Sequence, residues 1–270
     1  MNRILVTGGT GMVGKHLKKL LPDAVYVGSE FDLRDWSVTD SLLSRIKPNC
    51  VIHLAAKVGG IQDNLAKPAE FFDDNILINT HILKASHKHD VSKFVGILST
   101  CIYPDNGNGG ATYPMKEEDM FLGPPAPTNF SYGYAKRCLA VQIEAYNQQY
   151  GTKYSYLTPC NLYSELDNFE NGQKMHFITA LLKKIKDSNM TISLLGSGRP
   201  LRQFMYAGDL ARVINEVILK DISESFNVAP DYNYSIDDMA KMALNILKEK
   251  YRIQNQSWMV NIGKMLVLKN

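Results

Sequence analysis

The sequence lacks a long apolar run and contains few cysteines. No stretch approaches the roughly 18 consecutive apolar residues of a membrane-spanning helix, and the first residues lead directly into an expected strand without the apolar core of a signal peptide. The four cysteines of the 270-residue chain have neither CxxC spacing nor the density of a disulfide-rich scaffold: Cys50, Cys101, Cys138 and Cys160. We therefore expect free thiols, a cytoplasmic protein, no metal site and no membrane partner.

Neither sign of charge is in large excess. Lysine and arginine number 30 against 27 aspartate and glutamate, a formal net charge of +3. This excess is too small for the electrostatic footprint of a nucleic-acid-binding protein, so we expect no nucleic-acid partner. Apolar residues make up 45% of the chain and charged residues 21%, which is typical of a globular domain rather than a disordered chain. Any anionic ligand must be bound by a local site.

Apolar strands alternate with amphipathic helices over the N-terminal part of the chain. Strand-like runs occupy residues 3–6, 24–27, 50–56, 94–98 and 154–158, and helical patterns occupy residues 15–21, 38–46, 69–89 and 132–150. Ser37 is placed to cap the second of these helices, and Pro48 to end it. Each strand–helix–strand unit adds a parallel strand through a right-handed crossover. The sequence thus predicts an α/β protein with a doubly wound parallel sheet.

The alternation is interrupted at two places. Residues 104–128 are rich in Gly, Pro, Asn and acidic side chains and are too long for an ordinary connection, so we expect a functional loop. From residue 164 the pattern is mixed, with helices expected at 176–186, 209–219 and 235–250 and short strands at 191–195 and 226–229. We therefore expect residues 1–163 to form the domain with the doubly wound sheet, and residues 164–270 to form mainly a small mixed lobe on its edge.

A glycine-rich turn follows the first strand and opens the first helix. Residues 9–14 fit GxGxxG, and an overlapping GxxGxxG begins at Gly8. Such glycines make the tight turn, let the backbone approach a pyrophosphate and let the helix pack close to the sheet, with the helix N-terminus facing the anion. We expect a dinucleotide cofactor to contact Gly8, Gly9, Thr10, Gly11, Met12, Val13 and Gly14.

The end of the second strand bears on the choice between NAD and NADP. NAD usually requires an acidic side chain there for the ribose 2′-hydroxyl, whereas NADP requires that place to be free of negative charge. Gly28 and Ser29 follow the strand, which favours NADP, while Glu30 lies slightly beyond and keeps NAD as the alternative. Asp32 and Leu33 are expected to border the adenine.

A tyrosine and a lysine in a YxxxK arrangement begin the helix at residues 132–150. Their i, i+4 spacing places the phenol of Tyr132 and the ammonium of Lys136 on one helix face. A nearby cation lowers the pKa of a tyrosine from its usual value of about 10, and the pair can then act as an acid/base catalyst for a carbonyl. Ser99 follows the fourth strand, at the edge where parallel sheets bind ligands, and its hydroxyl could bond the same substrate oxygen.

Together these motifs resemble the extended short-chain dehydrogenase/reductase family. The shared features are the TGGxGxxG turn, the run at residues 54–56, Ser99 and the YxxxK. Finer motifs resemble the branch of that family that converts GDP-4-keto-6-deoxy-D-mannose to GDP-L-fucose with NADPH: residues 55–61, 99–104, 127–129, 167–169 and 196–204. The resemblance implies an NADP-dependent epimerase/reductase that acts on a GDP-sugar and forms a homodimer through helices beside the active site.

The resemblance also implies roles for individual residues. Tyr132 is expected to protonate the C4 oxygen as hydride arrives, Lys136 to bind the nicotinamide ribose, and Ser99 to orient the ketone. Cys101 and His176 match the residues that invert C3 and C5, where protons next to a ketone are acidic enough for a thiolate or an imidazole. Their alternatives are a small buried side chain and a satisfied helix histidine. Further cofactor contacts are implied at Leu54, Ala55, Ala56, Leu98, Pro159, Asn161, Leu162 and His176, and nucleotide contacts of the substrate at Lys184, Leu195 and Arg202.

Several positions depart from the pattern of the family. Residues 164–166 are Ser-Glu-Leu where the family has Gly-Pro-His, and Leu195 replaces a tryptophan beside the nucleotide. The likeness ends near Tyr251, and the C-terminal part of the chain is short relative to that of the family. Two alternatives therefore stay open: a related GDP-sugar 4-reductase or 4-epimerase, for instance on a heptose, and a catalytically degenerate dinucleotide-binding protein. The intact catalytic serine, tyrosine and lysine argue against the second.

Overall fold

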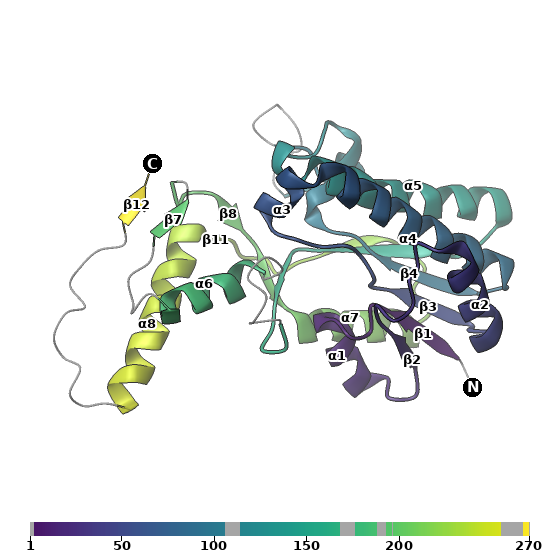
Figure 1. Cartoon of the computed structure of the whole chain (residues 1–270), viewed down its shortest axis with the longest axis horizontal. Coiled ribbons are helices and arrows are strands. Elements are labelled where there is room, and N and C mark those ends of the chain that lie inside the picture. Colours follow the sequence, from purple (N-terminus) through teal and green to yellow (C-terminus); the bar gives the residue numbers. More distant parts are fainter. Residues whose placement is uncertain are drawn as a thin grey trace.

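The central sheet contains six parallel strands. The computed structural model describes residues 3–269 except residues 106–113, 168–175, 188–192, 196 and 255–266, and it describes only the backbone of residues 193–195, 248–254 and 267–269. The strands lie in the order β10-β5-β4-β3-β1-β2 (Figure 1). Their bounds are β1 Ile4–Thr7, β2 Val25–Val27, β3 Cys50–His53, β4 Lys93–Ile97, β5 Ser155–Pro159 and β10 Phe226–Val228. The doubly wound parallel sheet predicted from the sequence is confirmed.

Helices cover both faces of this sheet (Figure 1). On one face α2, α4 and α5 contribute Leu42, Ile82 and Leu139 to a buried cluster, and on the other face α1 and α7 contribute Leu17 and Ile214. The helices are α1 Met12–Leu20, α2 Trp36–Ile46, α4 Pro68–Lys88, α5 Phe130–Tyr150 and α7 Ala207–Leu219. Within the described residues, no helix is both long and apolar enough to cross a bilayer.

The continuous apolar strands are explained by this double coverage. Every residue of β4 is buried, with Phe94 in the cluster under α4 and α5 and Val95 in the cluster under α7. Successive side chains of a strand point to opposite faces, so both faces must be apolar when both are covered. The strand order also brings the carboxyl ends of β1, β3 and β4 side by side, where the glycine turn, residues 54–56 and Ser99 begin.

The N-terminal cap of α2 differs from the prediction. The helix begins at Trp36, and its cap is Asp35, whose carboxylate accepts hydrogen bonds from the amides of Ser37 at 2.7 Å and Val38 at 3.1 Å. Ser37 therefore lies inside the first turn. Serine and aspartate are both good caps, and residue type alone does not decide between neighbouring candidates. The helix ends at Ile46, ahead of Pro48, as predicted.

The sheet domain is not confined to residues 1–163. β10 pairs with β5, with Val228 opposite Pro159, and α7 packs beside α1 through Ile214 and Leu17. Residues 207–228 thus belong to the sheet domain, although the expected boundary places them in the second lobe. The small lobe is formed by two segments of the chain, one between β5 and α7 and one after β10.

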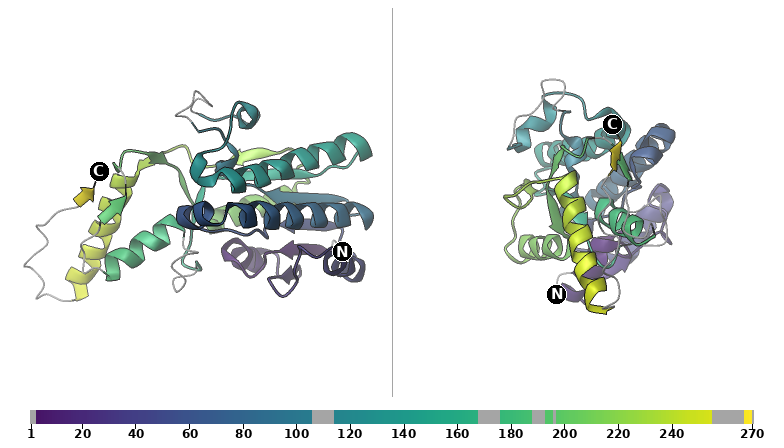
Figure 2. Two further views of the ribbon diagram at one scale, coloured as in Figure 1. Left: turned by 45° about the horizontal axis from the view of Figure 1, so that its top comes forward. Right: turned by 90° about the vertical axis from the view of Figure 1, so that its left-hand side faces the viewer.

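The small lobe is built around α6, Phe177–Asp187, and α8, Ile236–Gln254, at one end of the molecule (Figure 2). Its core consists of Leu181, Ile185, Ala240 and Leu244. Short strand pairs connect it: β6 Asn161–Tyr163 with β9 Phe204–Tyr206, β8 Leu201–Arg202 with β11 Tyr234–Ser235, and β7 Ser193–Leu195 with β12 Val267–Lys269. A small mixed lobe was expected here, but most of these two- and three-residue strands were not.

Candidate active site

The turn between β1 and α1 accepts only glycine at two positions. Gly8 has a φ of +67°, which glycine adopts readily, and a Cβ there would lie 2.7 Å from the amide nitrogen of Ala55. A Cβ on Gly14 would lie 2.4 Å from the carbonyl oxygen of Gly9, so α1 packs directly on the turn. At Gly11 a Cβ would meet only the carbonyl oxygen of Gly8, 3.2 Å away. This open side, at the N-terminus of α1, fits the diphosphate of a dinucleotide.

The acidic side chain after β2 is bonded to its own turn. Glu30 accepts a hydrogen bond at Oε1 from the amide of Gly28, at 2.7 Å, and this bond lowers the pKa of the Glu30 carboxyl. Asp32 accepts hydrogen bonds from the guanidinium of Arg34 at 2.8 and 2.7 Å, which lower the pKa of Asp32 to about 2. The end of β2 therefore carries two ionised carboxylates at neutral pH, and among the described residues Asp32 alone of the two has a cationic partner.

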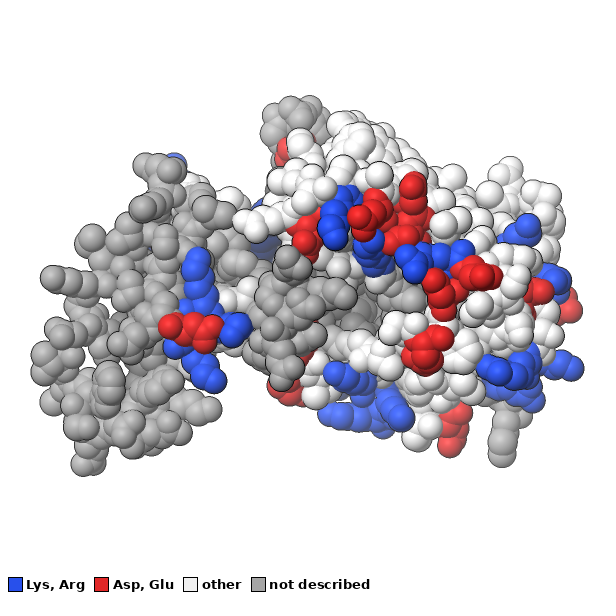
Figure 3. Space-filling model, viewed as in Figure 1, with Lys and Arg blue, Asp and Glu red and all other residues white. Residues whose placement is uncertain are grey.

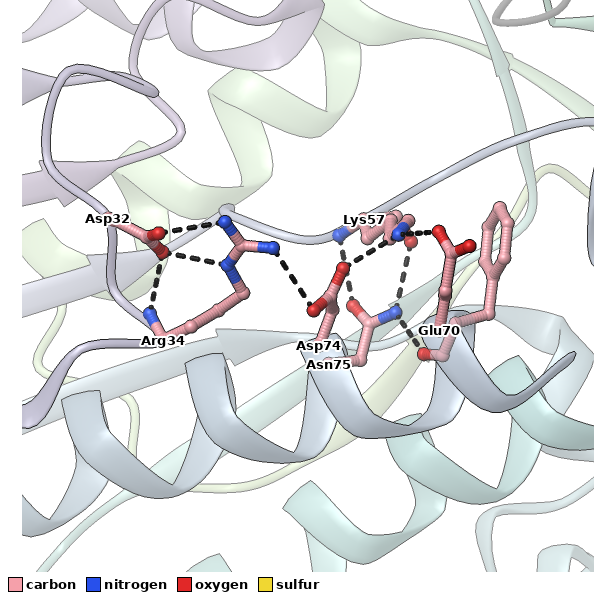
Figure 4. Close-up of polar contacts among 7 residues, drawn as sticks. Asp32, Arg34, Lys57, Glu70, Asp74 and Asn75 are labelled. Atoms are coloured by element: carbon pink, nitrogen blue, oxygen red, sulfur yellow. Dashed lines mark hydrogen bonds and ion pairs between the residues drawn. The ribbon is translucent and has the colours of Figure 1, made fainter. Parts of the chain in front are cut away.

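The loop after β3, which begins with residues 54–56, is fastened to α4 (Figure 4). The buried amide of Asn75 accepts a hydrogen bond from the backbone N–H of Lys57 and donates one to its carbonyl, both at 3.0 Å. The ammonium of Lys57 donates to Glu70 at 2.8 Å and to Asp74 at 2.7 Å. These contacts fix both the backbone and the side chain of Lys57.

Arg34 extends the same network to the loop after β2. Its guanidinium donates to Asp74 at 3.2 Å, so Asp74 lies between Arg34 and Lys57 (Figure 4). Acidic and basic side chains accordingly alternate along this face of the molecule (Figure 3). The two loops that are expected to border the cofactor are thus bound to one helix.

Ser99, Cys101 and Tyr132 gather beyond the end of β4. Ser99 accepts a hydrogen bond at Oγ from the amide of Cys101, at 3.3 Å, and caps the short helix η1, Thr100–Ile102. A Cβ on Gly133 would lie 2.4 Å from the carbonyl oxygen of Cys101, so this glycine lets the start of α5 approach η1 closely. Tyr132 lies near enough to Cys101 for the thiol to raise its pKa.

Lys136 is buried one turn further along α5. Its side chain donates a hydrogen bond to the carbonyl oxygen of Ile97 at 2.8 Å, and burial lowers its pKa to about 8. Burial raises the pKa of the Tyr132 phenol, and Cys101 adds to this effect. We expected Lys136 to lower the pKa of Tyr132, whereas burial and Cys101 both raise it.

Arg202 of β8 connects the small lobe with the site electrostatically. Burial raises the pKa of the Cys101 thiol, while a hydrogen bond with Ser99 and the positive charge of Arg202 lower it. Arg202 itself is exposed. The guanidinium that we expected to bind the nucleotide part of the substrate thus offsets part of the rise in the Cys101 pKa that burial causes.

His176 lies directly before α6, in contact with Asp167. Its Nδ1 is 3.1 Å from each carboxylate oxygen of Asp167, and the hydroxyl of Thr179 donates to the same carboxylate at 2.5 Å. Lys184 is exposed on α6. The side chain of Leu195 in β7 lies outside the described residues, as do Asn168 and Phe169 of the 167–169 motif.

The remaining expected cofactor residues line the carboxyl end of the sheet. Leu98 and Pro159 are buried, and Leu162 packs on the cluster under α7. Asn161 donates from Nδ2 to the carbonyl of Gln203 at 3.0 Å, which supports the β6–β9 pair. Leu33, expected beside the adenine, packs in the core. Ser29 is exposed at the end of β2.

Residues 164–166, which depart from the family pattern, fasten α1 to the segment leading into the small lobe. Nε2 of His16 lies 2.8 Å from Oγ of Ser164, and the hydroxyl of Tyr206 donates to both oxygens of Glu165, at 3.0 and 2.9 Å. Ser164 also accepts from the amide of Leu166 at 2.9 Å. Ser164 and Glu165, which differ from the family pattern, therefore stabilise the connection between α1 and the small lobe.

A buried polar chain beneath the site was not predicted. Thr7 contacts Nδ1 of His53 at 2.7 Å, Nε2 of His53 lies 3.1 Å from Oδ1 of Asn79, and Asn79 donates to the carbonyl of Ala135. Burial, together with a smaller contribution from the charge of Lys136, lowers the pKa of His53 to about 3, so His53 is neutral. The sequence feature that could have indicated these contacts is His53, a histidine at the end of the otherwise apolar strand β3. In the part of the chain that the structure describes, no three His, Cys, Asp or Glu side chains gather as metal ligands.

The fold and this site define a dinucleotide-dependent sugar-nucleotide enzyme of the epimerase type. Residues 4–229 match the model of the NAD dependent epimerase/dehydratase family, and the chain belongs to that family, within the extended short-chain dehydrogenases/reductases. The chain is 41% identical over 220 residues to the GDP-L-fucose synthase of Dictyostelium discoideum, covering 77% of this chain and 67% of that protein. It is 38% identical over 232 residues to a probable GDP-L-fucose synthase of Drosophila melanogaster, covering 79% of this chain and 71% of that protein.

Two solved structures share the architecture. A GDP-L-fucose synthetase from Naegleria fowleri bound to NADP superposes with a TM-score of 0.80 at 29% identity, covering 96% of this chain and 88% of that one. A GDP-6-OMe-4-keto-L-xylo-heptose reductase from Campylobacter jejuni superposes with a TM-score of 0.82 at 27% identity, covering 92% and 84%. Both neighbours are named for GDP-sugars, and one holds NADP.

Proposed function

We propose that this protein is an NADPH-dependent epimerase/reductase that converts GDP-4-keto-6-deoxy-D-mannose to GDP-L-fucose. The observation that carries the proposal is the grouping of Ser99, Cys101 and Tyr132 beyond β4, with Lys136 buried beneath them. Reduction needs a proton donor for a ketone oxygen, and epimerisation needs a base for the carbon beside it. The same group of residues supplies both.

Bound NADPH supplies the hydride for C4, and the protein supplies the proton. Tyr132 donates its phenolic proton to the C4 oxygen, and the hydroxyl of Ser99 orients that oxygen. Lys136 binds the nicotinamide ribose, and its ammonium is held at the carboxyl end of β4 by Ile97. A positive charge near the phenol stabilises the phenolate that forms when the proton leaves.

Cys101 and His176 act on C3 and C5. Inversion requires removal of a proton from one face of the sugar and return of a proton on the other. Burial raises the pKa of the Cys101 thiol, and the hydrogen bond with Ser99 and the charge of Arg202 offset part of this rise. Arg202, Lys184 and Leu195 bind the nucleotide part of the substrate in this proposal.

We also propose a cytosolic homodimer with no nucleic-acid partner. Phe72 and Leu77 of α4 and Val141 of α5 are exposed on neighbouring helices of the sheet domain, which supports dimerisation through these helices. The four cysteines, none of which is in a disulfide, suit a reducing compartment.

Reduction of a GDP-heptose ketone is the second candidate, favoured by the similarity to the Campylobacter reductase. The test is NADPH oxidation with GDP-4-keto-6-deoxy-D-mannose and with GDP-4-keto-heptoses, followed by assignment of the product stereochemistry. Turnover of the deoxymannose with inversion at C3 and C5 supports the proposal. Turnover of the heptose alone, or of neither sugar, contradicts it.

Two variants divide the chemistry. Tyr132→Phe should abolish reduction and leave exchange of the C3 and C5 protons with D₂O in place, because exchange needs only the base. Cys101→Ser should slow exchange while NADPH binding stays unchanged. Loss of both activities together in each variant would contradict the assigned roles.

A further inference from the structure

The contact between Asp167 and His176 determines the tautomer of the imidazole. Both carboxylate oxygens lie 3.1 Å from Nδ1. A carboxylate can only accept, so Nδ1 carries the hydrogen and donates it. In the neutral imidazole, Nε2 then holds the free electron pair.

Asp167 is held firmly for this contact. Its side chain is only 5% exposed, whereas the imidazole of His176 is 38% exposed. The hydroxyl of Thr179 donates to Oδ2 at 2.5 Å, and the amide of His176 donates to the same oxygen at 3.4 Å. The carboxylate is therefore fixed in the protein, while part of the imidazole can still be reached by a substrate.

His176 lies at the N-terminus of α6. It directly precedes the helix, and its carbonyl accepts the amide of Ala180. The partial positive charge of a helix N-terminus attracts a negative group, and the Asp167 carboxylate lies against this end of α6.

We propose that Asp167 is a positioning residue for epimerisation, an inference that rests on the proposed function. It fixes Nε2 of His176 as the nitrogen that exchanges a proton with the carbon beside the ketone. When Nε2 acts as base, the C–H bond breaks, its electron pair passes into the enolate, and its proton bonds to Nε2. The imidazolium that results is paired with the Asp167 carboxylate, and return of the proton reverses the step.

Asp167→Asn tests this role. The amide has the same shape but no charge, and its NH₂ can donate to Nδ1 and favour the other tautomer. We expect incorporation of deuterium at C3 and C5 of GDP-4-keto-6-deoxy-D-mannose, measured by NMR in D₂O, to slow about tenfold or more. The Kd for NADPH and the melting temperature should stay close to the wild-type values. Asp167→Glu, which restores the charge, should recover part of the rate.

Lys183→Gln is the matched control, because it removes an exposed ion pair with Asp187 from the same helix and leaves the pair of Asp167 and His176 intact. Its exchange rate should stay near that of the wild type. If the wild type is active and Asp167→Asn exchanges at the same rate, the role of Asp167 is overturned, while the proposed function stands. Equal slowing in Lys183→Gln would do the same, since it would show that the exchange rate responds to any change of charge on α6. A wild type that neither exchanges nor reduces this substrate would overturn the proposed function as well.

Discussion

Asn79 on α4 donates a hydrogen bond from Nδ2 to the backbone carbonyl of Ala135 on α5, at 3.3 Å. Ala135 directly precedes Lys136, and Oδ1 of Asn79 accepts from His53 at the end of β3. Asn79, Ala135 and His53 are all fully buried. The helix that carries Tyr132 and Lys136, the proposed catalytic pair, is thereby connected with the strands that end at the expected cofactor loops.

Replacing Asn79 should therefore affect both stability and catalysis. Asn79→Leu removes the partner of the buried Nε2–H of His53, and an unsatisfied buried donor costs about 1 to 3 kcal/mol. We expect a loss of that size in the free energy of unfolding, measured by urea denaturation, and a lower kcat for NADPH oxidation. Gln142→Leu, which removes a different α5–α4 contact with Thr80, should leave kcat unchanged. Equal kcat losses in both variants would refute a specific role for Asn79.

Lys136 should destabilise the fold at neutral pH. Its pKa is about 8 in the folded protein against 10.5 in the unfolded chain, so the charged form is disfavoured by burial. Below pH 8 both states are protonated and this cost is complete; between about pH 8 and 10.5 the folded state loses its proton first, and stability rises with pH.

Lys136→Met should accordingly stabilise the protein while abolishing reduction. The lowering of the Lys136 pKa from 10.5 to about 8 corresponds to about 3 kcal/mol, from which about 1 kcal/mol is subtracted for the lost hydrogen bond to Ile97. We expect a net gain of about 2 kcal/mol at pH 7 and a flatter stability curve above pH 8. Urea denaturation across this pH range measures both, and a destabilised variant would contradict the prediction.

His53 should make the protein sensitive to acid. Its pKa is about 3 in the folded protein against 6.5 in the unfolded chain, because burial disfavours its charged form. As the pH falls below 6.5, the unfolded chain takes up a proton that the folded protein does not, so stability decreases. The loss from this group should reach about 2 kcal/mol at pH 5. His53→Gln, which can still hydrogen-bond, should show a shallower dependence in the same window.

Glu30 should limit the affinity for NADPH. Its carboxylate is held at Gly28, at the end of β2, where a 2′-phosphate would add like charge. We expect NADPH to bind more tightly than NADH, and Glu30→Gln to strengthen NADPH binding several-fold in calorimetry without strengthening NADH binding. Glu216→Gln on α7, where Glu216 pairs with Lys220, is the control for a change of net charge. Tighter binding of NADH by the wild type would contradict this assignment.

Much of the sheet domain could be predicted because its signals are local. Each of the strands β1 to β5 gives an apolar run or a short strand pattern, and the glycine turn and YxxxK lie within single segments. The short strands of the small lobe, such as β8 at Leu201–Arg202, have too few residues to show a period. Their pairing partners are set by the tertiary structure.

The site was predictable as a set of residues but not as a set of contacts. Asp167 and His176 are nine residues apart, while Thr7 and His53 are 46 apart, and neither pair has the fixed spacing of a helix face. The effect of Arg202 on Cys101 likewise depends on the folding of one lobe against the other. Such couplings appear only in the three-dimensional arrangement.

The first segment of the small lobe separates β5 from α7 and β10 in the sequence, and this has a consequence for how the chain is made. During synthesis, β1 to β5 emerge first, but the face that contains Leu17 stays uncovered until α7 arrives with Ile214 and Leu210. β5 also remains an unpaired edge until β10 is complete at Val228. Nascent chains that end before this strand expose an apolar face and an open edge, which are the features that chaperones and aggregation partners bind. A fragment of residues 1–163 should therefore be insoluble. A fragment that ends after β10 should be soluble, because β10 covers the edge of β5 and α7 covers the apolar face.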